Sequence, residues 1–305
     1  MASEGLVMTS FYSSSPVCSP SRASILTGRY QTRSGIYPGV FNPANVGGLP
    51  HDEVTMAELL KPAGYSSAIV GKWHLGVGAN NTYLPTNQGF DHYLGIPYSH
   101  DFCPCFTCFA PNIPCFDSCR TDETPCPVFN NTDIVQQPAD LLSLTATYIN
   151  AATSFIKTKA GEDEPFFLYM AFQHTHHPQF ASPKFTNTSI RLKFGDSLNE
   201  LDWGVGQIFS ALTEAGVSNN TLVFFVSDNG PSLMREIRGG NAGPLRCGKG
   251  TTWEGGQRVP AIAWWPGTIT PGRSSQVYIR ASVDALYYRD DTGEISRDPR
   301  TKRLK

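Results

Sequence analysis

Residues 221–230 read TLVFFVSDNG, an apolar run that stops at a short polar cluster. A short apolar run bounded by turn-forming residues is typical of a buried strand. Just upstream, apolar residues recur with the period of a helix, at Leu198, Leu201, Val205, Ile208 and Leu212. This part of the chain therefore predicts a helix, then a strand, then a polar loop.

The same unit occurs twice more, in residues 51–74 and in residues 138–177. Gly64 is expected to end the first of these helices as a C-cap. The expected elements are helices over 51–64 and 138–157 and strands over 65–70, 165–172 and 260–265. Helices that alternate with unbroken apolar strands are typical of an α/β protein whose mixed, mostly parallel sheet is covered by helices on both faces.

Polar clusters follow three of these strands at their carboxyl ends. Ligands of open α/β sheets bind in the crevice outside those ends. We therefore expect six side chains to converge there: Lys72, His74, His174, His176, Asp228 and Asn229. The Asp-Asn-Gly sequence could equally be a plain turn, although a carboxylate beside an amide oxygen also suits Ca²⁺ or Mg²⁺. The histidines suggest zinc less than they suggest general acid catalysis or contact with an anion.

The composition excludes several classes of function. The 305 residues include 24 Lys and Arg against 26 Asp and Glu, a formal net charge of -2. There is thus no basic surplus for binding a phosphate backbone, and nucleic acid is not expected as a partner. No apolar run approaches the roughly 18 to 20 residues of a membrane-spanning helix. With 40% apolar residues the chain can form a sizeable core.

Six of the eight cysteines fall within residues 103–126: Cys103, Cys105, Cys108, Cys115, Cys119 and Cys126. Their irregular gaps favour disulfides over a zinc knuckle. Four glycosylation sequons point the same way, at Asn80, Asn130, Asn187 and Asn219. An oxidising, secretory compartment is therefore expected, although residues 1–15 lack the features of a signal peptide.

The segment Cys18-Ser19-Pro20-Ser21-Arg22 places a thiol four positions before a permanent cation. Residues from Ser21 onward are expected to form the first turns of a helix. A helix N-terminus and an arginine together attract anions and lower the pKa of a thiol. The alternative is a buried or disulfide-bonded cysteine beside a surface arginine.

Taken together, these motifs resemble the sulfatases, and within that family the arylsulfatases. The Cys-x-Pro-Ser-Arg signature at 18–22 continues as ASILTGR. The other matching motifs are GIYPGV (35–40), GKWHLG (71–76), GIPYSHD (95–101), THHPQF (175–180), DNGP (228–231) and RCGKGTT (246–252). The resemblance covers about residues 5–284. It implies an alkaline-phosphatase-like α/β fold and hydrolysis of sulfate esters of aryl, sulfated sugar or glycolipid compounds.

The resemblance also implies a modified nucleophile. Cys18 would be oxidised to formylglycine by the formylglycine-generating enzyme, and one hydroxyl of the hydrated aldehyde would attack sulfur. The second hydroxyl then allows sulfate to be expelled, a step that a thiol could not perform. Implied roles for other residues are anion binding by Arg22, Lys72 and Lys249, and proton transfer by His74 and His176. Ser99 matches a substrate-binding position, and Asp228 and Asn229 match two calcium ligands.

The cysteines are matched only in part. Cys108, Cys115 and Cys119 match cysteines of the disulfide-linked region of such enzymes, and Cys103 fits by spacing. Cys105 and Cys126 are less clearly placed and could pair with each other. Cys247 matches a cysteine whose partner lies beyond the end of this chain, so we expect a free thiol.

Three departures from the family pattern affect the expected function. An apolar strand followed by two calcium-binding aspartates is missing before Cys18, so the calcium site would be incomplete and weak. The smaller C-terminal domain is missing as well. We therefore expect a catalytic domain over 1–284 and a charged, disordered tail over 285–305.

Family members are lysosomal or secreted and often dimeric, which makes a homodimer an expectation here. One alternative is a catalytically inactive sulfatase variant that acts in binding or dimerisation. Another is phosphoester hydrolysis, which the missing zinc ligands disfavour.

Overall fold

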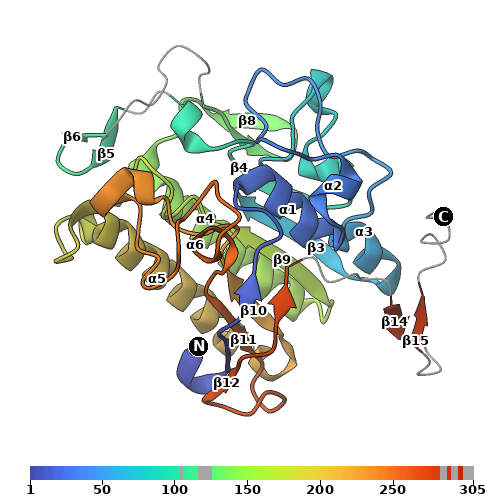
Figure 1. Cartoon of the computed structure of the whole chain (residues 1–305). Helices are drawn as coiled ribbons and strands as arrows, with labels where there is room; N and C mark the ends of the chain where they lie inside the picture. The colour runs from blue at the N-terminus through green and yellow to red at the C-terminus, as the bar shows by residue number, and fades with distance from the viewer. Residues whose placement is uncertain (104–105, 116–125, 282–286, 290–294, 298–305) are drawn as a thin grey trace.

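The computed structural model describes residues 1–103, 106–115, 126–281, 287–289 and 295–297. Two β-sheets form its centre, and helices lie on both sides of them (Figure 1). The expected α/β architecture is therefore observed. Among the described residues, no helix combines the length and the apolar composition that a bilayer crossing requires.

The larger sheet has five strands in the order β8-β7-β4-β3-β9. Its bounds are β3 (Ser66–Gly71), β4 (His92–Gly95), β7 (Val128–Asn130), β8 (Asp133–Gln136) and β9 (Phe166–Ala171). Strand β3 runs parallel to both β4 and β9, whereas β7 and β8 extend the sheet in antiparallel fashion. Of the three parallel strands, β3 and β9 are the ones expected at 65–70 and 165–172, whereas β4 was not expected.

The second sheet has four strands in the order β10-β11-β1-β12. Its bounds are β1 (Leu6–Met8), β10 (Val223–Val226), β11 (Ala261–Trp264) and β12 (Arg273–Ser275). Strand β11 is antiparallel to both β10 and β1, and β1 is parallel to β12. A short strand therefore does precede Cys18, but it joins this smaller sheet.

The five-stranded sheet ends at β9, and the four-stranded sheet ends at β10. Each is an edge strand, since β9 pairs with β3 and β10 with β11, and no other described strand pairs with either of them. The expectation that residues 221–226 form a buried strand is wrong, because Phe224 is 56% exposed and the other residues of β10 are half-buried. An apolar strand is buried only when neighbours cover it, and β10 has a neighbour on one edge alone.

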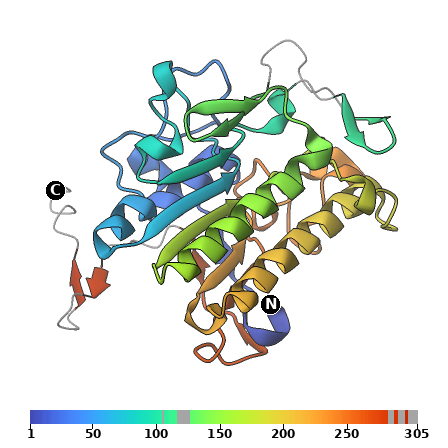
Figure 2. The same cartoon turned by 180° about the vertical axis from the view of Figure 1, so that it is seen from behind.

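Helices cover both faces of the five-stranded sheet. Their bounds are α1 (Cys18–Thr27), α2 (Gln31–Ser34), α3 (Met56–Leu60), α4 (Leu141–Gly161), α5 (Leu192–Glu214) and α6 (Glu254–Gln257). On one face Ile69 packs with residues of α1 and α3, and on the other Val70 packs with residues of α4. Helices α4 and α5 lie against each other across the back of the molecule (Figure 2).

Three helices begin at residues other than those expected. Helix α4 begins at Leu141 rather than at residue 138, because Asp140 caps it by accepting from the Leu142 N–H. Helix α1 begins at Cys18 rather than at Ser21, since Pro20 in the first turn has no N–H to satisfy. The helix expected over 51–64 begins only at Met56, because Thr55 and Glu58 form a capping box there. Gly64 does adopt the left-handed conformation, at φ 81°, after the 3₁₀ turn η2 (Lys61–Ala63).

Three further strand pairs are short: β2 (Phe11–Tyr12) with β13 (Ile279–Arg280), β5 (Thr107–Phe109) with β6 (Ile113–Pro114), and β14 (Tyr287–Arg289) with β15 (Ile295–Arg297). The last pair lies within the tail for which we expected no regular structure. The rest of 285–305 lies outside the described residues.

Candidate active site

Cys18, the first residue of α1, lies at the centre of the polar cluster. Its Sγ is 3.4 Å from Lys72 Nζ, 3.6 Å from Lys249 Nζ and 3.7 Å from Asn229 Oδ1. Lys72 follows β3 and Asn229 follows β10, so side chains from both sheets meet at this thiol. The convergence expected at the carboxyl ends of the strands is thus observed for these residues.

The environment of Cys18 favours negative charge. The side chain is buried, which by itself raises the pKa of a thiol. The ammonium groups of Lys249 and Lys72 and a contact with His74 outweigh burial, so the pKa of Cys18 lies well below its ordinary value. Burial lowers the pKa of Lys72 despite its proximity to Cys18. The site is therefore suited to an anionic group at residue 18.

Arg22, one turn further along α1, forms a buried ion pair with Asp228. Its Nε and Nη2 each lie 2.9 Å from Asp228 Oδ2, and its Nη1 donates to the Lys72 carbonyl at 2.8 Å. The side chains are 8% and 19% exposed. Burial lowers the pKa of Arg22, but Asp228, Tyr169 and Cys18 together raise it above its ordinary value. Arg22 therefore links the loops that follow β3 and β10.

Ser99 and His176 extend the cluster away from Cys18. Ser99 Oγ accepts from Lys72 Nζ at 3.2 Å and lies 3.5 Å from His176 Nδ1. Burial, Lys249 and Lys72 hold the pKa of His176 well below its ordinary value, although Asp101 opposes this. His176 is consequently a neutral imidazole at neutral pH, and its Nδ1, which lies 2.7 Å from the His177 carbonyl, carries the ring proton.

His74 is held by one ring nitrogen. Its Nε2 lies 2.7 Å from the Phe41 carbonyl, which can only accept, so Nε2 carries the proton. Nδ1 is buried and has no hydrogen-bond partner among the described residues. Burial and Lys72 lower the pKa of His74. The result is a neutral imidazole with an unused acceptor beside Cys18.

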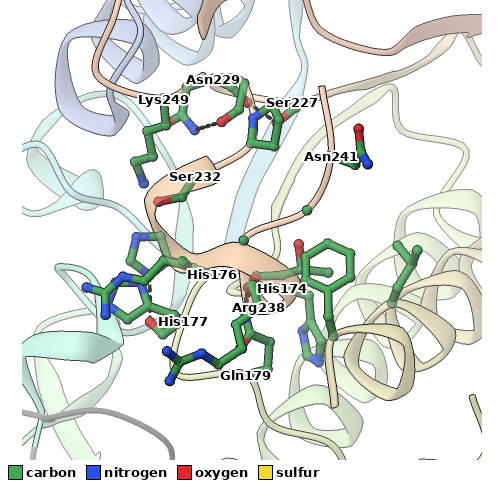
Figure 3. A pocket seen from close by; sticks show the side chains of 18 of the residues that line it. His174, His176, His177, Gln179, Ser227, Asn229, Ser232, Arg238, Asn241 and Lys249 are labelled. Carbon is green, nitrogen blue, oxygen red and sulfur yellow. Dashed lines mark hydrogen bonds between the residues drawn. The ribbon is translucent and has the colours of Figure 1, made fainter. Parts of the chain in front are cut away.

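A cavity of about 620 Å³ opens next to the cluster, within the range of sites that hold small organic ligands. Lys72, His174, His176, Asp228, Asn229 and Lys249 are among the residues that line it. Figure 3 shows Lys249 and Asn229 on one side of the cavity and His176 and His177 on another. His174 lines the cavity, but its Nε2 is directed at Glu200, 3.2 Å away.

The two expected calcium ligands do not by themselves form a metal site. Asp228 Oδ2 is engaged by Arg22, and Asn229 donates from its Nδ2 to the Gly230 carbonyl. The described residues contain no group of three His, Cys, Asp or Glu side chains that could hold an ion. Because Ca²⁺ takes about six to eight oxygen ligands, the residues present do not fit it.

Two functional features escaped the sequence analysis. Asp101 lies 3.9 Å from His176 Nδ1 and 3.8 Å from His177 Nε2. Burial raises the pKa of Asp101, but neighbouring groups, His176 and Ser99 first among them, lower it. The pKa of Asp101 therefore lies below its ordinary value. Glu200 is buried on α5 beside Leu201. A glutamate on the inner face of an amphipathic helix was the available signal, because such a residue requires a buried partner.

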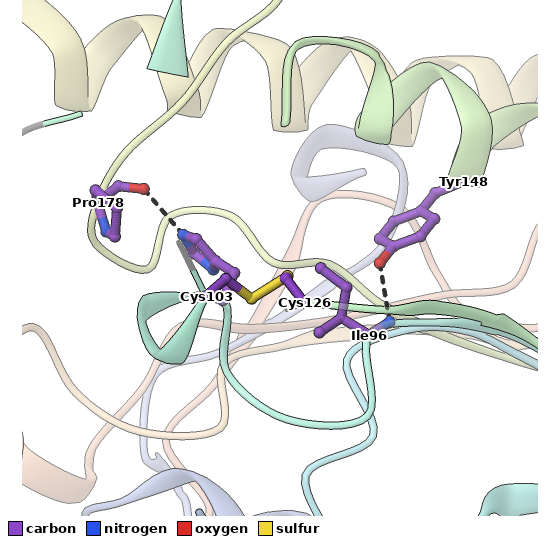
Figure 4. The surroundings of a disulfide bond; sticks show 6 residues. Ile96, Cys103, Cys126, Tyr148 and Pro178 are labelled. Atoms are coloured by element: carbon purple, nitrogen blue, oxygen red, sulfur yellow. Dashed lines mark hydrogen bonds between the residues drawn. A yellow bond between two sulfur atoms is a disulfide. The ribbon is translucent and has the colours of Figure 1, made fainter. Parts of the chain in front are cut away.

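Two disulfides lie among the described residues, Cys108–Cys115 and Cys103–Cys126, and Figure 4 shows the second of them. The pairing of Cys105 with Cys126 is therefore wrong, because Cys103 lies next to Cys126 in the fold. Cys105 and Cys119 lie outside the described residues. Cys247 is a free, exposed thiol, as expected.

Known proteins resemble this chain over most of its length. A family model described as Sulfatase matches residues 1–287. Arylsulfatase A from Homo sapiens is 49% identical over 288 residues, which are 94% of this chain and 56% of that protein. N-acetylgalactosamine-6-sulfatase from Rattus norvegicus is 44% identical over 283 residues, which are 90% of this chain and 53% of that protein. The chain thus spans just over half the length of the curated relatives it matches.

Solved structures show the same relationship. The PsFucS1 sulfatase from Pseudoalteromonas sp. has a TM-score of 0.79 and 29% identity, over 92% of this chain and 58% of that chain. Ps i-CgsB in complex with k-i-k-neocarrahexaose has a TM-score of 0.78 and 28% identity, over 92% of this chain and 62% of that chain. The family match, the identities and the shared architecture lead to one conclusion: this chain belongs to the sulfatase family.

Proposed function

We propose that this protein hydrolyses sulfate esters with a nucleophile derived from Cys18. The observation that carries the proposal is the position of Cys18 at the start of α1, with the ammonium groups of Lys72 and Lys249 within 3.6 Å of its sulfur. Two fixed cations at this distance suit the charge that develops on sulfate oxygens. Relatives named as an arylsulfatase and as a sugar sulfatase support the same class of reaction.

The proposed nucleophile is formylglycine, made from Cys18 by the formylglycine-generating enzyme. One hydroxyl of the hydrated aldehyde attacks sulfur. A bond forms between this hydroxyl oxygen and sulfur, and the bond from sulfur to the alcohol oxygen breaks. The second hydroxyl then loses its proton as the aldehyde reforms, and the bond between carbon and the sulfate oxygen breaks. The products are alcohol and sulfate, and the aldehyde is regenerated with no change in oxidation state.

His74 and His176 are the proposed proton carriers. The free Nδ1 of His74 can accept the proton of the second hydroxyl, because Nε2 is committed to the Phe41 carbonyl. Lys249 and, in its protonated form, His176 would protonate or hydrogen-bond the leaving oxygen, and Ser99 would bind the substrate. Arg22 would hold the modified residue in place, as its bonds to Asp228 and to the Lys72 carbonyl already fix its guanidinium.

In this proposal calcium binds the protein only weakly. Asp228 and Asn229 correspond to two ligands of the family's ion, but Arg22 occupies the Asp228 oxygen. No catalytic step is therefore assigned to a metal. We expect calorimetric titration with Ca²⁺ to show weak or no binding.

The cellular setting is proposed from covalent features. Two disulfides favour an oxidising compartment, and the four sequon asparagines are exposed, as N-glycosylation requires: Asn80, Asn130, Asn187 and Asn219. We propose a lysosomal or secreted glycoprotein, with a homodimer as its form. Residues 1–284 would be the catalytic domain and 285–305 a separate tail.

The test is sulfate release from a chromogenic aryl sulfate by protein made in a secretory host. Mass spectrometry of the peptide that contains Cys18 establishes whether the aldehyde is present. We expect wild type and Cys247→Ser to release sulfate and Cys18→Ser to be inactive. Aldehyde-containing protein that releases no sulfate from aryl or sugar esters would refute the proposal in favour of an inactive binding or dimerisation protein.

A further inference from the structure

The loop of residues 174–182, which follows β9 and carries His176, is anchored at both ends by one side chain. That side chain is Glu200 of α5. His174 Nε2 lies 3.2 Å from Glu200 Oε2, and the backbone N–H of Ser182 donates to Oε1 at 3.2 Å and to Oε2 at 3.3 Å. His176 lies in the chain between these two anchors.

The anchor is buried. The side chains of His174 and Glu200 are each 2% exposed. The Phe180 ring lies 4.4 Å from the His174 ring, and Thr145 Oγ1 of α4 is 3.4 Å from His174 Nε2. A carboxyl group is costly to bury without hydrogen bonds. Here the hydrogen bonds of the carboxylate to described residues go to the two ends of a single loop, so its position fixes the separation of those ends.

The middle of the loop is held by other contacts. His100 Nε2 donates to the Pro178 carbonyl at 2.9 Å, visible as a dashed line to Pro178 in Figure 4. Gln179 Nε2 donates to the Thr175 carbonyl at 3.2 Å and also to the Arg238 carbonyl. These bonds tie the loop to neighbouring segments, whereas Glu200 ties it to the long helix α5. Loss of Glu200 would therefore displace the loop without releasing it.

We propose that Glu200 is a positioning residue that sets the place of His176 through His174 and Ser182. The proposal rests on the proposed function, since it concerns the proton or hydrogen bond that His176, in its protonated form, would give to the leaving oxygen. Glu200 does not line the cavity and touches no substrate. Its loss should therefore matter most when the leaving group most needs a proton.

The kinetic test compares two substrates. One is a nitrophenyl sulfate, whose leaving group departs readily without a proton, and the other is the sulfate ester of an alkyl alcohol. Glu200→Ala should lower kcat for the alkyl ester by about tenfold to a hundredfold, with KM nearly unchanged, and lower kcat for the nitrophenyl ester by less than about threefold. Glu214→Ala, also on α5 but exposed, is the matched control and should alter neither value.

Two further variants separate positioning from folding. Ser182→Pro removes the N–H donor and places the proline ring where that N–H faces Glu200, so this end of the loop must move, while the φ of -63° at Ser182 is one that proline accepts. It should reproduce the selective loss if Glu200→Ala fails to fold. Glu200→Gln should restore most of the rate, because its amide can accept from Ser182 and donate to the other tautomer of His174. An equal loss for both substrates in these variants would overturn the proposal.

An activity-independent measurement keeps the proposal apart from the proposed function. In ¹⁵N-histidine-labelled protein, Glu200→Ala or Ser182→Pro should shift the ring signals of His176, assigned with a His176→Gln variant, whereas Glu214→Ala should not. If wild type hydrolyses neither ester, the proposed function fails, but this readout still decides the positioning. Unchanged His176 signals in folded Glu200→Ala and Ser182→Pro proteins would refute it.

Discussion

Removal of the Asp228 carboxylate should destabilise the fold, because it leaves the guanidinium of Arg22 buried with one partner. Asp228→Ala deletes the acceptor of two 2.9 Å bonds and leaves only the bond to the Lys72 carbonyl. Breaking a buried ion pair by removal of one partner costs roughly 3–5 kcal/mol. Since Asp228 is 19% exposed, the lower value of about 3 kcal/mol applies. For a chain of 305 residues, whose entropy of unfolding is about 0.6 kcal/mol/K, the melting temperature should fall by about 5 °C.

The assay is thermal unfolding at neutral pH, with two comparison variants. Asp228→Asn keeps an acceptor but no charge and should lose about 1–2 kcal/mol. Glu214→Ala breaks the ion pair with Lys157, whose side chains are 61% and 54% exposed, and should cost less than about 1 kcal/mol. Equal melting temperatures for Asp228→Ala and Glu214→Ala would refute the role assigned to the Arg22 pair.

The same assay examines the metal. If Ca²⁺ binds no more tightly than about 1 mM, then 1 mM CaCl₂ should stabilise the wild-type protein by only about 0.4 kcal/mol. A much larger rise in melting temperature, lost in Asp228→Ala, would show that Asp228 is chiefly a calcium ligand and that the reasoning from Arg22 is wrong.

Three other predictions concern protonation and metal binding. Burial lowers the pKa of His100 to about 4. As the pH falls, this side chain therefore takes up a proton near pH 6.5 in the unfolded chain but only near pH 4 in the folded protein. Stability should therefore fall by about 3 kcal/mol between pH 6.5 and pH 4, as measured by denaturant unfolding, and His100→Gln should flatten that dependence; an equal slope would contradict it. In protein with unconverted Cys18, on a Cys247→Ser background, ultraviolet absorbance should show the thiol titrating at lower pH than an ordinary cysteine. Lys249→Met should move this titration to higher pH because a cation that lowers the pKa is removed; no movement would show that Lys249 does not act on the thiol. Calorimetry should detect weak or no Ca²⁺ binding, and sub-micromolar affinity would disprove the incomplete site.

Much of the site could be predicted from the sequence, because polar clusters at the carboxyl ends of apolar strands gather at one place, here even though the strands belong to two sheets. Lys72 and Asn229 lie within 3.7 Å of Cys18 for this reason. The family motifs added Lys249, which follows no strand directly and which strand patterns alone could not place.

The errors share a physical cause. Whether β10 is buried depends on the strands that flank it, and the sequence of an apolar run does not indicate which strands these are. The pairing of Arg22 with Asp228 likewise joins residues far apart in the chain, so no local pattern indicates it. By contrast, Thr55 and Glu58 have the spacing of a capping box, and this signal could have corrected the start of α3.

The ending of one sheet at β9 and of the other at β10 has a consequence for handling the protein. An edge strand presents unpaired backbone N–H and C=O groups, and β10 adds the exposed ring of Phe224 to them. Such an edge can act as a template for a strand of another molecule. Concentrated solutions should therefore form intermolecular β-structure and scatter light, and a lysine in place of Phe224 should suppress this aggregation.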